Sequence, residues 1–338
     1  MTHSRHINIP LFIPHFGCGH ACVFCDQRAI SGGETYRRDR IEQTLALRIA
    51  SLPAGADAEI AFFGGSFTGI DREEMIALLD LAQGYIDRDL ARTIRLSTRP
   101  DYISGETLKI LSRYSVGTVE LGIQSMSDRV LAASHRGHTA AVTRRACAMI
   151  RDAGFTLGGQ MMTGLPCSEE EDERNTAAEI VSMGAAEARV YSTVVIHGTE
   201  LCRMTQRGEY EPLSKEDAIR RAAEAVRIFE QSGVRLLRVG LCETASLHGD
   251  GGIAAGYYSP AFGDEVRSRI FARVIAEQIE REGIPRGASV TLEVPCGTAG
   301  YAAGHKKVNK LIILEKYGVK IAKVLENPML LGYNIVIK

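Results

Sequence analysis

Three cysteines near the start of the chain have a spacing that suits metal chemistry. Cys18, Cys22 and Cys25 occur in the run GCGHACVFC, as Cys-x3-Cys-x2-Cys. Thiolates at this spacing suit one iron–sulfur cluster, and three of them leave a four-iron cluster one ligand short. An iron with an open coordination position can bind a substrate or cofactor directly. The spacing therefore favours catalysis over simple electron storage.

Two other interpretations of the cysteines explain less. Structural zinc usually takes four ligands, and His20 lies between two of the cysteines with no partner pair downstream. A redox dithiol made of Cys22 and Cys25 leaves Cys18 without a role. The cluster accounts for all three thiols and is favoured over both alternatives.

The remaining five cysteines are widely scattered and do not form a disulfide framework. We expect them to be reduced thiols that serve as small buried hydrophobic residues. They are Cys147, Cys167, Cys202, Cys242 and Cys296.

The composition is that of a folded, soluble chain. Its 338 residues are 45% hydrophobic and 24% charged, enough for a large core in one large or two modest domains. No apolar run approaches the roughly 20 residues of a membrane helix. Pro10 and Pro14 interrupt the apolar N-terminal stretch, which does not have the pattern of a signal peptide. We expect a cytoplasmic protein without membrane contact.

The charge is distributed unevenly along the chain. The net charge is −1, but residues 301–338 hold seven lysines and two glutamates, a balance of +5 that leaves −6 for residues 1–300. The basic segment could contact RNA phosphates or be a solvated helix face, and charge alone favours the solvated face.

Apolar β-type runs alternate with helical patterns over the first two thirds of the chain. This rhythm predicts an α/β fold with a parallel sheet. Six strands are too few for a closed eight-stranded barrel, so we predict a partial (β/α)6 TIM-like barrel with its site at the carboxyl ends of the strands. The strands are expected near residues 7–13, 58–63, 93–98, 117–123, 155–162 and 188–195.

Helix periodicity and capping patterns support this interpretation. One apolar face predicts a helix over 40–52, and Ser168 with Glu171 and Ser214 with Asp217 resemble capping boxes. Gly233 offers a stop to the helix that Ser214 opens.

The pattern changes after residue 240. A Gly-rich stretch precedes an amphipathic helix near 263–282, and strands are expected near 289–295, 319–325 and 333–337. We predict a barrel over residues 1–240 and a small α+β accessory region over 241–338.

The cysteine run resembles the signature of the radical S-adenosylmethionine (SAM) superfamily, in which an aromatic residue, here Phe24, precedes the last cysteine. The resemblance implies a 4Fe-4S cluster held by the three cysteines, with SAM bound to the fourth iron. It also implies an external electron donor and reductive cleavage of SAM to a 5′-deoxyadenosyl radical.

Further matches follow successive predicted strands. Gly64 and Gly65 in FFGGSF resemble the glycine motif that meets the SAM amino group through its backbone. In STRPDY, Ser97 stands where related enzymes carry a SAM-binding glutamate, and Arg99 is a candidate for the SAM carboxylate or the substrate.

The stretch VELGIQSMSDRVLAASHRGHT closely resembles the Elongator catalytic subunit. The resemblance implies SAM contacts for Gln124, at the ribose, and for Arg136, at the carboxylate. Glu120 is a further polar candidate that could instead be paired structurally, and Gln160 falls near the expected ribose site. Two apolar residues would flank adenine or fill the core: Val194 and Val195.

These features support three hypotheses. The leading one is a radical SAM enzyme of the Elongator-like branch that acts on tRNA or a related nucleic acid, with phosphate contacts from HKKVNK (305–310). The second is oxidation of a porphyrin or another small molecule, as in coproporphyrinogen oxidases. The third is a non-enzymatic module that binds a cluster or zinc.

Overall fold

The computed structural model describes residues 6–13, 18–19, 22–25, 36–53, 55–243, 247–249 and 251–338. Within them the largest sheet is parallel and its strands are paired in chain order. Its strands are β1 (His6–Ile13), β2 (Asp57–Gly64), β3 (Thr93–Thr98), β4 (Val116–Gln124), β5 (Thr156–Thr163), β6 (Glu187–Ser192) and β8 (Arg235–Val239).

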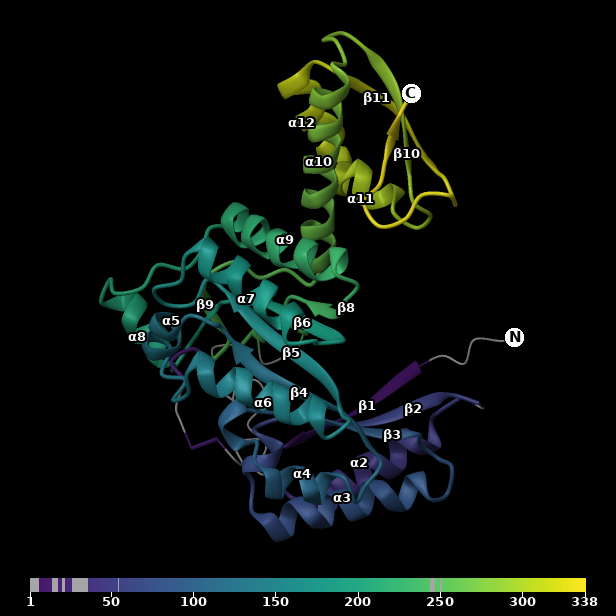
Figure 1. The fold of residues 1–338 in the computed structure, drawn as a ribbon. Coiled ribbons are helices and arrows are strands. Elements are labelled where there is room, and N and C mark those ends of the chain that lie inside the picture. Colours follow the sequence, from purple (N-terminus) through teal and green to yellow (C-terminus); the bar gives the residue numbers. More distant parts are fainter. Residues whose placement is uncertain are drawn as a thin grey trace.

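Helices pack along one side of this curled sheet (Figure 1). The buried faces of most of these helices meet apolar strand residues in one continuous core, and the helix over 200–206 packs in a smaller, separate cluster. The helices are α2 (Arg38–Ala50), α3 (Arg72–Ile86), α4 (Gly105–Leu111), α5 (Asp128–Ala133), α6 (Ala140–Asp152), α7 (Glu170–Ser182), α8 (Glu200–Gln206) and α9 (Lys215–Gln231). Strands β1 and β8 form the two edges of the sheet, so the barrel is open.

The predicted fold class and all six predicted strands are confirmed. The sequence interpretation missed the seventh strand, β8, because its run RLLRV is an edge strand whose arginines hide the apolar pattern. Helix α9 has the predicted Ser214 cap, and Gly233 follows its end with φ 74°.

The predicted capping box at the start of α7 is wrong by one residue. Glu169 and Asp172 form it, in place of Ser168 and Glu171. The Ser168 hydroxyl instead donates to the buried Glu173 carboxylate at 3.2 Å and accepts from Arg221 at 3.1 Å. Ser168, which the sequence pattern assigned to the cap, therefore bonds to the buried ion pair of Glu173 and Arg221.

The C-terminal part stands beside the barrel on the long helix α10 (Phe262–Glu282), as Figure 1 shows. It has a second apolar core, built by α10, α11 (Ala299–Ala303), α12 (Val308–Tyr317) and a mixed sheet. That sheet contains β10 (Ser289–Val294), β11 (Lys320–Glu326) and β12 (Val336–Ile337), in the order β11-β10-β12. The Gly-rich stretch contributes β9 (Ile253–Ala255), which pairs with β7 (Val195–Ile196). The domain boundary at residue 240 stays a prediction.

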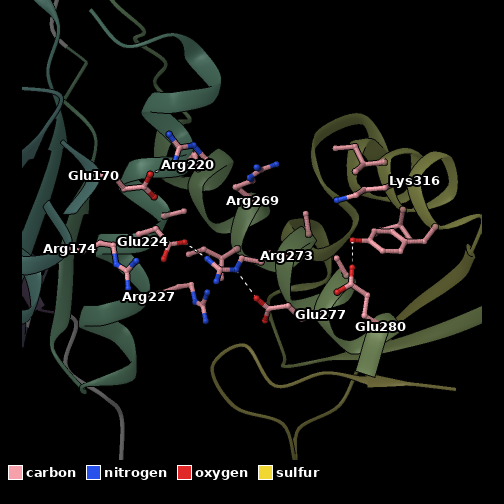
Figure 2. Close-up of a pocket in the computed structure, with 17 residues that line it drawn as sticks. Glu170, Arg174, Arg220, Glu224, Arg227, Arg269, Arg273, Glu277, Glu280 and Lys316 are labelled. Carbon is pink, nitrogen blue, oxygen red and sulfur yellow. Dashed lines mark hydrogen bonds and ion pairs between the residues drawn. The ribbon is translucent and has the colours of Figure 1, made fainter. Parts of the chain in front are cut away.

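A charged groove of about 440 Å³ lies between the two parts, lined by α7, α9, α10 and α12. Figure 2 shows Arg273 at its centre, paired with Glu224 and, at 2.7 Å, with Glu277. None of the predicted site residues lines this groove. The two cores therefore meet partly through exposed ion pairs.

No helix in the described part of the chain is long and apolar enough to span a membrane.

Asn309 joins the three helices of the C-terminal part. Its side chain is buried, and Nδ2 lies 2.9 Å from the Ser268 carbonyl of α10 and 3.0 Å from the Tyr301 carbonyl of α11. We predict that Asn309→Ala lowers the free energy of unfolding by about 2 kcal/mol, because it removes a buried amide whose hydrogen bonds join α12 to α10 and α11. Urea unfolding measures this, with the exposed Glu315→Ala on the same helix as control. Equal stability of the two variants would contradict it.

Candidate active site

The cysteine loop is bound to segments that follow several strands. The Gly19 amide donates to the Tyr102 hydroxyl at 2.8 Å, the Val23 amide donates to the Ser134 carbonyl at 3.3 Å, and the Val23 carbonyl accepts from the Leu201 amide at 2.7 Å. These partners follow β3, β4 and β7 in the chain. The loop therefore lies across the carboxyl end of the sheet, where sites of parallel barrels are built.

The Cys22 thiol faces two buried arginines. Its sulfur lies 3.1 Å from Nη1 of Arg136 and 3.8 Å from Nη1 of Arg99. Neighbouring guanidinium groups balance negative charge placed nearby, such as that of a metal-bound sulfur. The position of Cys22 is thus suited to a metal ligand.

Hydrogen bonds fix both arginines. Arg99 makes a bidentate pair with Asp101, with both N···O distances 3.0 Å, and it also donates to the backbone carbonyl of Arg136. Arg136 donates to the carbonyl of Gly122. Because each guanidinium is anchored from a different strand end, their direction toward Cys22 is fixed.

Two buried side-chain atoms have no partner in the described residues: Oε1 of Gln124, and Nε of Arg136, whose Nη1 contacts Cys22. Gln124 ends β4 with φ 66°. A Cβ on Gly122 would lie 3.2 Å from Nε2 of Gln124 and 3.5 Å from Nη2 of Arg136, so this glycine leaves room for the two side chains to meet. Buried polar atoms are nearly always paired, so these two fit a polar ligand such as SAM.

Gly64 is required by the backbone. It has φ 107°, and a Cβ there would lie 2.8 Å from the Ile13 carbonyl oxygen. That same oxygen accepts from the Gly65 amide at 2.9 Å. The two glycines therefore let the ends of β1 and β2 approach closely, while their contact with a SAM amino group stays a prediction.

The side chains of Cys18, Cys22 and Cys25 do not form a close group in this structure. Cys18 is exposed, with its sulfur 3.5 Å from the Ser66 hydroxyl, and Cys22 and Cys25 are half-buried. Among the residues that the structure describes, no three cysteine, histidine or acidic side chains are grouped closely enough to hold a metal ion. Phe24 packs against an apolar cluster that includes the buried Val195. The assignment of the three cysteines as cluster ligands stays a prediction.

A buried layer of charge fills the sheet below this site. Arg95, 1% exposed, lies 2.7 Å from the Glu59 carboxylate, 2.6 Å from that of Glu187 and 3.5 Å from that of Glu120. Arg189 pairs with Glu120 at 2.7 Å. This layer joins strands β2, β3, β4 and β6 through side chains.

Three predicted site residues belong to this layer. Gln160 donates to Glu120 and lies 3.5 Å from the Ser97 hydroxyl. Glu120 is thus paired structurally, which was the second of the two roles predicted for it. Its Oε2 accepts no hydrogen bond from the described residues. Burial raises the pKa of the neighbouring Tyr191 to about 12, so its hydroxyl stays protonated at neutral pH.

Sequence reasoning missed several of these residues. The signal was present in the strands, where polar side chains recur at every second position: Arg95 and Ser97, Thr118 and Glu120, and Glu187, Arg189 and Tyr191. Alternate strand residues share one face, so this pattern indicates a polar barrel interior.

The five cysteines outside the opening triad divide into two groups. Cys147 and Cys202 are buried as predicted, and burial raises the pKa of Cys147 to about 12. The prediction was wrong for Cys167, Cys242 and Cys296, which are exposed. Cys167 lies in a left-handed turn, and the other two lie in loops.

Comparison with a solved structure supports the fold. An N-terminally truncated archaeal Elp3 from Methanocaldococcus infernus matches with a TM-score of 0.61 and 21% identity, over 85% of this chain and 66% of that chain. The fold and the loop across its strand ends define an α/β protein with an open barrel.

The sequence comparisons identify its family. The model described as the radical SAM superfamily matches residues 12–180, and that of the radical SAM C-terminal domain matches 186–271. The chain belongs to the radical SAM superfamily and is an enzyme of that type, as the cysteine motif predicted.

Two curated relatives confirm the resemblance to the Elongator branch. A tRNA uridine(34) acetyltransferase from Methanocaldococcus jannaschii is 33% identical over 127 residues, 37% of this chain and 24% of that protein. Elongator complex protein 3 from Mus musculus is 26% identical over 212 residues, 56% of this chain and 38% of that protein. The chain thus spans well under half the length of these relatives.

Arg95 is predicted to hold the charge layer together. Arg95→Met should lower the free energy of unfolding by about 3–5 kcal/mol, because it leaves buried carboxylates without their cation. The loss should be smaller at acid pH than at neutral pH, since protonation removes the repulsion. Denaturant unfolding at several pH values measures it, with the exposed Arg92→Met as control. A pH-independent loss equal to that of the control would contradict the role of Arg95.

His138 should make stability fall in acid. Burial, with help from the nearby Arg136 charge, lowers the pKa of His138 to about 4. The unfolded chain then binds a proton that the folded chain excludes, so stability declines as pH falls from about 6.5 to 4, by up to about 3 kcal/mol. We expect His138→Gln to flatten this part of the stability profile of the cluster-free protein. An unchanged slope in the variant would rule out His138 as its source.

Proposed function

We propose that this enzyme uses a 4Fe-4S cluster and SAM to generate a 5′-deoxyadenosyl radical. The observation that carries the proposal is the contact of the Cys22 thiol with Arg136 and Arg99, together with the buried Gln124 amide oxygen that has no partner in the described residues. Cys18, Cys22 and Cys25 would be the three iron ligands, leaving one iron open for the SAM amino and carboxylate groups. When bound, the cluster supplies the electron for reductive cleavage of the SAM sulfonium.

The surrounding residues have distinct roles in this proposal. Arg136, whose Nε is free of partners in the described residues, would hold the SAM carboxylate through its guanidinium. Gln124 would accept a hydrogen bond from the ribose through Oε1. Arg99, fixed by Asp101, would offset the negative charge of the thiolates. Phe24 and the apolar cluster on which it packs would exclude water from one side of the loop.

The proposed substrate is RNA, and tRNA in particular. The support is the similarity to a tRNA uridine(34) acetyltransferase and to Elongator complex protein 3. Because the matches cover a small part of those proteins, only hydrogen abstraction from the nucleic acid is proposed, without their complete reactions.

Reductive SAM cleavage tests the proposal. Anaerobically reconstituted protein should release 5′-deoxyadenosine with dithionite, and Cys22→Ala should reduce this by about 100-fold or more because a cluster ligand is lost. Cys296→Ala, which removes an exposed cysteine outside the site, serves as the matched control.

Arg136→Lys should raise the KM for SAM because it loses the bidentate fork. Zinc without iron or sulfide in anaerobically purified protein would refute the cluster.

The substrate is tested separately with tRNA isolated from cells grown in deuterated medium. Abstraction from tRNA should place deuterium in 5′-deoxyadenosine, and total tRNA should stimulate its release. Release without stimulation or deuterium would exclude tRNA and leave the SAM chemistry standing.

A further inference from the structure

The C-terminal part carries a short basic loop between two helices. The order β10, α11, loop, α12, β11 places Gly304–Lys307 between α11 and α12. His305, Lys306 and Lys307 are exposed, and no ion pair of theirs occurs in the described residues. A Cβ on Gly304 would lie 2.8 Å from the Asn309 amide nitrogen, so only glycine permits this tight turn.

Hydrogen bonds of the Asn309 side chain fix the position of the loop. The buried Asn309 donates to carbonyls of both α10 and α11, at 2.9 Å from Ser268 and 3.0 Å from Tyr301. Lys306 and Lys307 have φ values of 51° and 65°, a region that lysine rarely adopts. Two exposed lysines therefore stand where glycine would cost less backbone strain, and the fixed turn holds both charges at the surface.

An apolar surface begins where the basic loop ends. Val308, Leu311 and Leu314 recur every three residues on α12 and are 41%, 60% and 46% exposed. Large apolar side chains exposed together usually mark a binding surface. No other segment in the described part of the chain buries these three side chains.

Strand β11 borders this helix. The Lys310 ammonium donates to the Ala322 carbonyl of β11 at 3.4 Å, so the two elements lie side by side. β11 is an edge strand and adds the exposed Lys320, Lys323 and Leu325. Positive charge and apolar surface therefore occur together on both elements.

We propose that the loop 304–307, helix α12 and strand β11 form a binding site for single-stranded RNA. The phosphates would contact Lys306 and Lys307, while unstacked bases would lie on Val308 and Leu311. This combination fits single-stranded RNA, whose backbone is anionic and whose base faces are apolar. KH modules likewise hold a nucleotide backbone with a short glycine-containing loop. The choice of RNA over DNA rests on the proposed function.

Charge complementarity favours RNA over a protein partner for this surface. Residues 301–338 carry a net charge of +5, and Glu326, one of their two acidic side chains, is engaged by the Gly297 amide at 3.0 Å. A second copy of the chain that met this surface with the same surface would bring positive charge against positive charge and be repelled. A polyanion gains from the same charges.

Fluorescence anisotropy with a labelled single-stranded oligoribonucleotide tests the site. The full chain should bind it more tightly than the matching duplex, with affinity that falls as potassium chloride rises. Lys306→Glu with Lys307→Glu should weaken binding at least about tenfold and lower the slope of log affinity against log salt by about 1.4, since each phosphate contact on a single strand contributes roughly 0.7. Leu311→Ser should weaken binding about fivefold with the slope unchanged, because it removes only apolar contact.

Lys109→Glu with Arg113→Glu, an equal charge reversal at exposed positions by α4, is the matched control and should bind like the parent chain. Equal losses in both double variants, or no binding by the parent chain, would overturn the proposal. A dimer that Leu311→Ser dissociates, with RNA affinity unchanged, would assign the surface to a second copy and also overturn it. The assay needs neither SAM nor the cluster, so its failure is distinguishable from failure of the proposed chemistry.

Discussion

The buried charge layer around Arg95 is the interaction on which the rest of the structure depends. One guanidinium meets carboxylates from β2, β4 and β6, and Arg189 and Gln160 extend the layer toward the strand ends. Buried ions are costly unless their partners are well placed, so the layer fixes how these strands lie side by side. It gives the open barrel a polar interior, above which Cys22, Arg99 and Arg136 meet.

The site depends on this arrangement because its residues come from distant parts of the chain. Arg136 follows β4 and Arg99 follows β3, yet both guanidinium groups contact the Cys22 sulfur. A parallel sheet makes this possible, since the carboxyl ends of its strands all lie at one edge. The cysteine loop is therefore positioned by side chains that the barrel orients.

The sequence allowed much of this to be predicted, and the omissions have physical causes. Apolar runs with β propensity located six strands, and motifs at their ends located Gln124 and Arg136. The edge strand β8 was missed because its two arginines, three residues apart, interrupt its apolar run. Glu59, Arg95 and Glu187 were missed because a charged strand residue is usually exposed, and only the alternation across several strands shows that these point inward. The exposure of Cys167, Cys242 and Cys296 depends on loop conformation, which periodicity does not describe.

The most direct test of the central claim is electron paramagnetic resonance of the reconstituted, dithionite-reduced protein, recorded with and without SAM. The account predicts a reduced 4Fe-4S signal that changes on addition of SAM, because SAM occupies the open iron beside Gln124 and Arg136. A protein without an iron–sulfur signal, or with a signal that saturating SAM leaves unchanged, would contradict it.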